Sequence, residues 1–274
     1  MKVSSLTFYY CKLLRMKTMR KFLWLFGAVL ALSSCGSMGI DGSGPIERRN
    51  IPVQDFTGIR VEDGIHLYLT GDQDLTVNAE GQGNILDITE IVNDGGLLKI
   101  RFNKRVGNHA GVTVNIGLKD PIDYIGYAGS GTVSMDADTA LMQGNKVLLE
   151  KSGSGKAVDI RAAGTDVSFR LEGSGSINGS VEADQFYSKI SGSGNIQVFG
   201  TSNAQQLEIS GSGKYRCRDL KTQKSEVHIS GSGEMEVWAE EELNVSISGS
   251  GRVRYKGNPE ITSNISGSGS ISSL

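Results

Sequence analysis

The sequence predicts an all-β fold, a β-helix or solenoid in which coils of about 18–24 residues stack on one another. The first observation is a repeat: from residue 129 onwards the tripeptide Gly-Ser-Gly occurs eight times, and successive copies begin 18 to 24 residues apart. The second is a strict alternation of apolar and polar residues on both sides of each copy. The third is composition, because 37 of 274 residues are Gly but not at every third position, which excludes collagen. The copies begin at Gly129, Gly153, Gly173, Gly192, Gly211, Gly231, Gly249 and Gly267.

Residues 1–34 are predicted to be a lipoprotein signal peptide. Phe22–Leu32 is an apolar run of eleven residues that follows several basic residues and is too short to span a bilayer. The next four residues, Leu32-Ser33-Ser34-Cys35, resemble the lipobox of bacterial lipoproteins. The resemblance implies that Cys35 is acylated and becomes the new amino terminus. A start at one of two later methionines would give a signal of more usual length, so residues 1–15 are also open to interpretation as a mis-called start.

Residues 35–45 are predicted to form a flexible tether, because this stretch is rich in Gly and Ser. After cleavage, Cys217 would be the one cysteine besides Cys35, so no internal disulfide is expected. We therefore expect the body to be lipid-anchored in the bacterial cell envelope, on the outer membrane, and to face either the periplasm or the outside.

Residues 46–128 are predicted to be a less regular β segment that begins or caps the solenoid. Several stretches alternate as the repeats do, and turn signals such as Asn93-Asp94-Gly95-Gly96 separate them. Asp120-Pro121 ends the segment just before the first Gly-Ser-Gly. The predicted strands are Phe56–Val61, Ile65–Leu69, Leu75–Val77, Leu97–Phe102 and Val112–Ile116.

Residues 129–274 are predicted to be the repeat β-helix. When the first glycine of each motif is position 0, position −2 is apolar or aromatic in seven of eight copies, and Lys151 is the exception. Position +4 is apolar or aromatic in all eight, whereas position +3 is polar or charged. A period of two indicates β-strands, and stacking them at about 4.8 Å per coil buries one continuous core.

The glycines of the motif have two physical interpretations. They lie at a corner, where the backbone takes positive φ angles, or at a place where two walls of the solenoid approach too closely for a side chain. We favour the corner, because a serine that could cap turn amides precedes the motif in six of eight copies.

The repeats are similar to a known family, the auto-transporter adhesins with a head GIN domain, over residues 46–272. The resemblance includes Arg49 and Phe56 near the start, the stretch Leu97-Leu98-Lys99-Ile100, and serial turns such as Gly175-Ser176-Ile177-Asn178. It implies a right-handed single-stranded β-helix and an adhesin-like role in bacterial secreted or lipid-anchored proteins. It supplies no catalytic residues.

The charge of the mature chain argues against nucleic acid as a partner. Residues 1–34 contain six basic side chains and no acid, so their removal leaves 22 basic and 30 acidic side chains, a net charge of −8. Such a surface repels phosphate backbones and anionic lipid.

We predict no catalytic residue. Charged side chains at position +3, such as Lys214 and Glu234, alternate in sign from coil to coil. The acidic groups Asp72/Asp74, Asp136/Asp138 and Glu240–Glu242 are interpreted as solvated loop charge, because catalytic carboxylates need a pocket that shifts their pKa.

We also predict no metal site and no cofactor. His66, His109 and His228 are far apart in sequence, and Cys217 is interpreted as a small core residue. Calcium-binding repeats need an Asp where this chain has apolar residues such as Val133.

The ligand-binding residues are left unknown, with one hint. Phe199 and Trp238 share position +7, and outward rings there could stack on sugars. We favour the interpretation that the chain has turned a corner by +7 and that both rings belong to the core.

These observations predict a non-enzymatic envelope lipoprotein whose body binds a surface glycan or protein. The alternatives are a carbohydrate-active enzyme on a β-helix and an envelope structural or assembly protein. Homo-oligomers could form through the solenoid ends, because the strand edges of end coils can pair with another chain.

Overall fold

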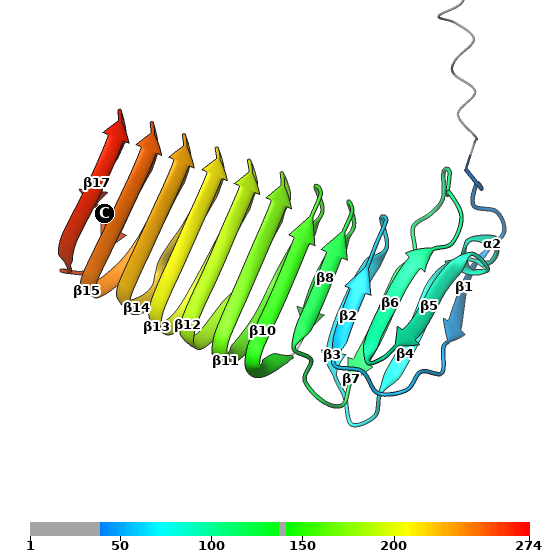
Figure 1. Cartoon of the computed structure of the whole chain (residues 1–274). Coiled ribbons are helices and arrows are strands. Elements are labelled where there is room, and N and C mark those ends of the chain that lie inside the picture. The colour runs from blue at the N-terminus through cyan, green and yellow to red at the C-terminus, as the bar shows by residue number, and fades with distance from the viewer. Residues whose placement is uncertain (1–38, 137–140) are drawn as a thin grey trace, which may run out of the picture.

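The computed structural model describes residues 39–136 and 141–274. The protein is nearly all-β, with 72% strand and 2% helix, and forms a β-solenoid of about seven turns (Figure 1). The predicted solenoid is thus confirmed. The signal peptide 1–34 and the acylation site Cys35 lie outside the described residues, and no described helix is long and apolar enough to cross a membrane.

The N-terminal segment contains nine strands and one helical turn. They are β1 (Ile46–Asn50), β2 (Gly58–Val61), β3 (His66–Gly71), β4 (Thr76–Gln82), α2 (Gly83–Leu86), β5 (Thr89–Asp94), β6 (Leu97–Phe102), β7 (Thr113–Leu118), β8 (Tyr124–Ala128) and β9 (Thr132–Asp136).

The repeat region contains the remaining strands, several of which bend around most of a coil. They are β10 (Met142–Ser152), β11 (Lys156–Gly173), β12 (Ser176–Gly192), β13 (Asn195–Gly211), β14 (Lys214–Gly231), β15 (Glu234–Gly249), β16 (Arg252–Lys256), β17 (Glu260–Gly267) and β18 (Ser270–Ser273).

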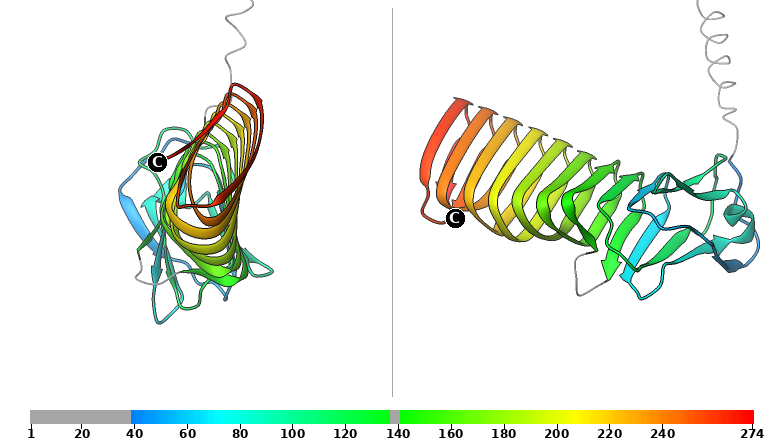
Figure 2. Two further views of the ribbon diagram at one scale, coloured as in Figure 1. Left: turned by 90° about the vertical axis from the view of Figure 1, so that its left-hand side faces the viewer. Right: turned by 60° about the horizontal axis from the view of Figure 1, so that its bottom comes forward.

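Each coil is a flattened ring with two limbs (Figure 2). The first limb follows a Gly-Ser-Gly motif, and the second limb leads into the next motif. The second limbs stack as one parallel sheet, in which β2, β8, β10 and the later coils up to β17 lie side by side (Figure 1). We call this sheet the second-limb face.

Identical positions stack in register, as the alternation predicts. Ile190, Ile209, Ile229, Ile247 and Ile265 are successive partners at position −2. The first four are buried, so the row forms a continuous apolar core.

The two interpretations of the glycines apply to different glycines of the motif. The first glycine has a positive φ in all eight copies, for example +122° at Gly192, so it makes the corner as predicted. The second glycine, at position +2, has an ordinary φ angle. A Cβ on Gly175, however, would lie 2.4 Å from the carbonyl oxygen of Gly155 in the preceding coil. The backbones of neighbouring coils therefore approach too closely at this position for any side chain.

The N-terminal segment has a topology that alternation alone does not predict. β2 pairs with β6 on one side and with β8 on the other, and β3 lies likewise between β7 and β9. The first coil of the chain is thus inserted between two later ones.

Antiparallel strands close the N-terminal end. β4 pairs with β7, β1 pairs with β4, and β5 forms a hairpin with β6. Residues 39–43, which the sequence places in a tether, lie against the cap: the amide of Gly42 donates to the Asn108 carbonyl at 2.7 Å.

Candidate functional site

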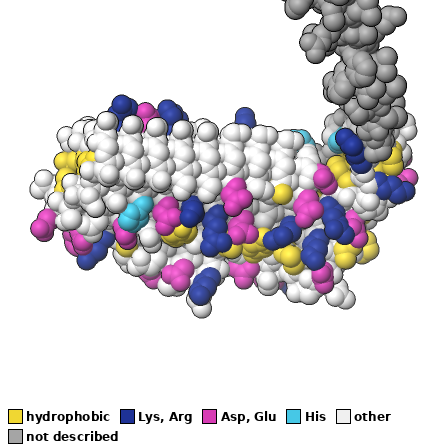
Figure 3. All heavy atoms as spheres, turned by 45° about the horizontal axis from the view of Figure 1, so that its top comes forward, with side chains coloured by type: hydrophobic (Ala, Val, Ile, Leu, Met, Phe, Trp, Pro, Cys, Tyr) yellow, Lys and Arg dark blue, Asp and Glu magenta, His cyan; other side chains and the backbone are white. Residues whose placement is uncertain are grey.

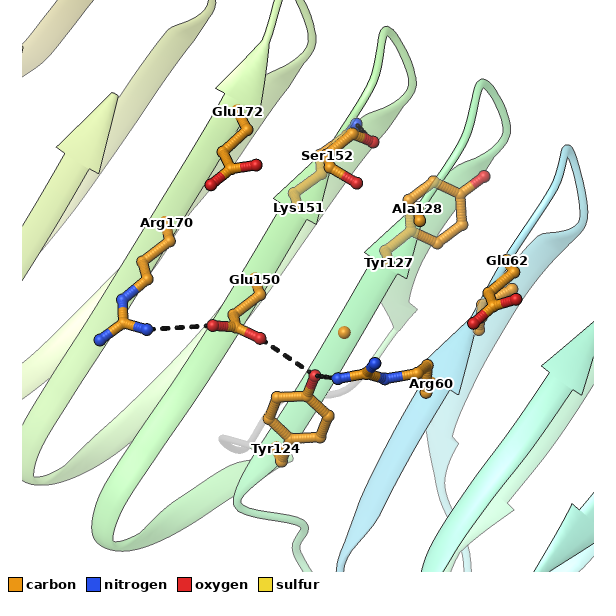
Figure 4. Close-up of a pocket in the computed structure, with 12 residues that line it drawn as sticks. Arg60, Glu62, Tyr124, Tyr127, Ala128, Glu150, Lys151, Ser152, Arg170 and Glu172 are labelled. Atoms are coloured by element: carbon orange, nitrogen blue, oxygen red, sulfur yellow. Dashed lines mark hydrogen bonds and ion pairs between the residues drawn. The ribbon is translucent and has the colours of Figure 1, made fainter. Parts of the chain in front are cut away.

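A shallow hollow of about 260 Å³ lies on the second-limb face, where the N-terminal segment meets the repeats. It spans β2, β8, β10 and β11 (Figure 4). Gly126 of β8 lines it at position −3, where the following coils carry Glu150 and Arg170. Because Gly126 has no side chain, the backbone of β8 forms the floor.

Tyr124 forms one wall of the hollow. It lies two residues before Gly126, on the same face of β8, and a Cβ at Gly126 would overlap its phenol. The Arg60 guanidinium from β2 lies 5.7 Å from the centre of the Tyr124 ring. The glycine thus allows the ring to lie over the strand, and the arginine holds it there.

A chain of polar contacts crosses the hollow (Figure 4). Arg60 Nη2 donates to the Tyr124 hydroxyl at 2.6 Å, and this hydroxyl donates to Glu150 Oε2 at 3.1 Å. Arg170 Nη1 donates to the other carboxylate oxygen, Glu150 Oε1, at 3.0 Å. Four strands thereby contribute to one fixed constellation.

The surroundings of Arg60 and Tyr124 shift the pKa of both groups upward. The hydrogen bond to Tyr124 raises the pKa of Arg60, and burial raises the pKa of Tyr124. Tyr124 therefore stays a neutral donor, and Arg60 stays a cation. Since both oxygens of Glu150 accept hydrogen bonds, its carboxylate is a positioning anion, and the site is better suited to holding a polar ligand than to proton transfer.

Lys151 explains the exception at position −2. It lies in β10 beside Glu150, but its side chain points inward and is 2% exposed. Its Nζ lies 5.4 Å from the Tyr127 ring centre and donates to the Ser152 carbonyl at 3.4 Å. Burial lowers its pKa.

Sequence reasoning missed this site. Its signal was present in the repeat register: Gly126 is the one position −3 residue without a side chain, and Tyr124 precedes it by two residues. The contribution of Arg60 could not be read from the repeat, because β2 comes from a segment far away in sequence.

The interpretation of Phe199 and Trp238 as core residues is wrong. Phe199 is 49% exposed on β13, since the outward phase persists to position +7. Trp238 is half-buried on β15, where the Lys256 ammonium lies 3.6 Å from its ring centre and its indole donates to Glu240 Oε1 at 3.1 Å.

The acidic cluster Glu240–Glu242 lies in β15, so its assignment to a loop is also wrong. Lys221 and Lys224 of the neighbouring coil pair with it, at 3.4 Å from Glu240 and 3.3 Å from Glu242. The charges at position +3 pair in the same way: Lys214 lies 3.2 Å from Glu234, whose other oxygen lies 3.0 Å from Arg252.

The other two acidic pairs are Asp72/Asp74 and Asp136/Asp138. Asp72 and Asp74 are exposed in the loop after β3. Asp136 accepts a hydrogen bond from the Tyr68 hydroxyl at 2.7 Å, and Asp138 lies outside the described residues.

Cys217 is fully buried, which confirms its interpretation as a core residue, and burial raises the pKa of its thiol to about 12. His66, His109 and His228 lie in different parts of the fold. Within residues 39–136 and 141–274, no group of three or more His, Cys, Asp or Glu side chains could hold a metal ion.

A second concave surface, of about 750 Å³, follows the corner between the limbs from β10 to β14. Successive coils contribute polar side chains to it, among them Thr165, Asp184 and Asn203. Asn203 Nδ2 donates to Asp184 Oδ1 at 3.0 Å. It is wider and more open to solvent than the hollow and holds its polar groups less tightly, so the hollow is the stronger candidate.

Solved structures share this fold. A putative lipid binding protein from Parabacteroides distasonis is 29% identical, with a TM-score of 0.79 over 86% of this chain and 99% of that one. A putative adhesin from the same species is 21% identical (TM-score 0.80, 86% and 100% covered), and one from Parabacteroides merdae is 17% identical (0.78, 87% and 100%). No curated protein matches the chain.

A family profile also matches, over residues 55–259, which is most of the solenoid. That range includes the hollow and all but the last of the Gly-Ser-Gly corners. The chain therefore belongs to the family described as putative auto-transporter adhesin, head GIN domain.

Proposed function

We propose that this protein is a lipid-anchored component of the bacterial cell envelope whose solenoid binds a carbohydrate without catalysis, through the hollow on the second-limb face. The observation that carries the proposal is the fixed chain Arg60–Tyr124–Glu150–Arg170 around Gly126. Family membership supports an adhesin-like role.

The chemistry of the hollow suits a sugar. An aromatic ring offers an apolar surface to the ring hydrogens of a sugar, while fixed donors and acceptors at its rim bind hydroxyl groups. The carboxylates of Glu62 and Glu172 and the hydroxyl of Ser152 line the same hollow and supply further acceptors. Since these side chains are held by one another before binding, ordering them on binding costs little conformational entropy.

The binding test compares three variants on immobilised polysaccharides, both neutral and uronic-acid-containing. Gly126→Thr fills the hollow without changing a positive φ, Tyr124→Ala removes the aromatic wall, and Lys156→Ala is a control on an exposed first-limb position. We expect the first two to weaken binding at least tenfold and the control to leave it unchanged. Equal binding by all three would refute the role of the hollow.

The anchoring test uses intact cells. Metabolic labelling with palmitate should mark the wild-type chain and not Cys35→Ala. We expect protease added outside the cells to remove the body. If the body is digested only after the outer membrane is opened, adhesion is wrong, and a periplasmic structural role becomes the better interpretation.

One of the similar solved structures is that of a putative lipid binding protein. For this chain, we infer that the lipid is the acyl anchor at Cys35. Protein secreted without the acyl chain should stay at the bottom of a vesicle flotation gradient, in vesicles of phosphatidylethanolamine and phosphatidylglycerol. Flotation of that protein would instead indicate lipid binding by the solenoid.

A second candidate function is polysaccharide cleavage. Its favouring observation is that Glu62, Glu150 and Glu172 gather around the hollow with Arg60 and Arg170 (Figure 4). Such an enzyme would release new reducing ends from bound polysaccharide, and Glu172→Gln would abolish the release. We expect no release, because both oxygens of Glu150 already accept hydrogen bonds that hold the carboxylate in place.

A further inference from the structure

The C-terminal end of the solenoid is open. β17 and β18 pair with β15 and β16 on one side, and within the described chain no element packs on their other side. Ile265 continues the buried isoleucine row but is 38% exposed, and Ile261 and Leu274 are exposed as well. Apolar side chains are visible at that end of the surface (Figure 3).

The opposite end is closed. There, the antiparallel strands β4 and β1 and the β5–β6 hairpin lie across or beside the last coil. Within residues 39–136 and 141–274, the solenoid therefore has one free parallel edge, which offers backbone amides and carbonyls together with the end of the core. Natural proteins protect such edges, because they pair readily with other strands.

The open edge lacks the charges that usually protect it. Residues 260–274 contain one charged side chain, Glu260, whereas β14 contains seven and β15 contains five. Two such edges would therefore meet with little repulsion. An acidic or basic partner would find no complementary charge there.

We propose that the open edge pairs with the same edge of a second copy, so that the two solenoids join end to end about a twofold axis. The edge strands would run antiparallel across the interface, and the exposed isoleucines of the two copies would meet to continue the core. Because the other end is closed, the product is a dimer and not a filament.

The open edge lies far from the predicted anchor, and this position suits a contact between two membranes. The first described residues lie at the closed end, where Ile40 pairs with Val106, and the C-terminal coil lies at the far end of the body (Figure 1). If the anchor at Cys35 is correct, which rests on the proposed function, the open edge faces away from the membrane. Copies on two neighbouring cells could then bind each other.

The test uses the full acylated chain in two batches of lipid nanodiscs, one with biotinylated and one with fluorescent lipid. Capture of fluorescent discs on streptavidin measures pairing. Ile265→Lys places a charge at the end of the core, where its long side chain can reach water. Ser210→Lys is the matched control, since it adds the same charge at an exposed position of β13, which is paired on both sides and lies away from the open edge.

We expect wild-type discs to pair, Ser210→Lys discs to pair equally, and Ile265→Lys discs to pair at least tenfold less, with unchanged circular dichroism. No capture of wild-type discs at micromolar concentration, or equal capture by the Ile265→Lys discs, would overturn the proposal. A chain that does not load onto discs contradicts only the anchor. Pairing is then measured by sedimentation, where a wild-type dimer and an Ile265→Lys monomer support it and a wild-type monomer overturns it.

Discussion

Gly211 has a backbone conformation that other residues rarely adopt. Its φ is +125°, and an added Cβ would lie 2.5 Å from the carbonyl oxygen of Gly192 in the preceding coil. We predict that Gly211→Ala lowers the free energy of unfolding by at least about 2 kcal/mol, through strain and displacement of the neighbouring coil. Ser212→Ala, at the exposed centre of the same motif, should change it by less than about 0.5 kcal/mol. Urea unfolding of the two variants measures the difference, and equal losses would contradict this role.

Lys151 makes the stability of the solenoid depend on pH. Burial lowers its pKa in the folded state below the ordinary 10.5, so between these two values the unfolded chain binds more protons, and rising pH stabilises the fold. Below the folded-state pKa, both states are protonated, and the folded state bears the full cost of a buried charge.

We therefore predict that Lys151→Met stabilises the protein at pH 7 by about 1 kcal/mol. The gain should shrink as the pH approaches 10.5, while Tyr127, whose own pKa burial raises to about 12, contributes equally to both proteins. Urea unfolding of the two proteins from pH 7 to 10 measures this gain in the free energy of unfolding. A gain that is constant with pH would mean that packing, and not charge, is responsible.

At the scale of residues, alternation predicted the core well and the exceptions poorly. Up to the last coil, the rows at positions −2 and +4 are buried as expected, because each side chain faces the same position of the next coil. Phe199 was misplaced, since nothing local shows where a bent strand turns its corner.

At the scale of elements, ion pairs between neighbouring strands differ in burial, and their contributions should differ accordingly. Arg254 of β16 donates to Glu236 of β15, whose side chain is 11% exposed, and Arg252 pairs with Glu234, whose side chain is 40% exposed. Removing the first arginine leaves a largely buried carboxylate without its close ion-pair partner.

We predict that Arg254→Met lowers the free energy of unfolding by about 2 kcal/mol. Arg218, 3.7 Å from Glu236, compensates in part. Arg252→Met should cost less than about 1 kcal/mol, because its partner remains hydrated. Thermal and urea unfolding in low salt check both values, and a reversed order would show that burial does not control these pairs.

The order of the N-terminal strands could not be predicted, because it depends on long-range pairing. The strand predictions near β2, β3, β4, β6 and β7 are confirmed. Alternation gives each strand a buried face but no neighbour, so the insertion of β2 between β6 and β8 had no local signal. The hollow depends on that insertion, since Arg60 reaches Tyr124 only because β2 lies beside β8.

At the scale of the whole molecule, the solenoid is an array of nearly equal coils, and its stability should be close to a sum over them. Deleting residues 193–211 removes 19 residues, one full coil, and joins Gly192 to Ser212 with the motif intact. We predict a folded protein with a smaller urea m-value, because less surface is buried.

Deleting residues 193–202, about half a coil, is the matched control. It would join Gly192 to Asn203, remove the second glycine of the motif together with the positive-φ Gly200, and leave the neighbouring coils without a complete coil to pair with, so this protein should not fold cooperatively. Circular dichroism and urea unfolding separate the two outcomes. A half-coil deletion that unfolds as cooperatively as the full-coil deletion would contradict the array description.

The backbone hydrogen bonds between coils run along the long axis of the solenoid, and this direction has a mechanical consequence. A force applied between the anchor end and the open end pulls on these bonds one coil at a time, as in unzipping, instead of shearing many at once. Each coil that detaches would release 18 to 20 residues, roughly 60 Å of extended chain. Under tension the molecule would lengthen in steps, and each step would dissipate mechanical work. The solenoid would therefore limit the peak force between the surfaces that it joins.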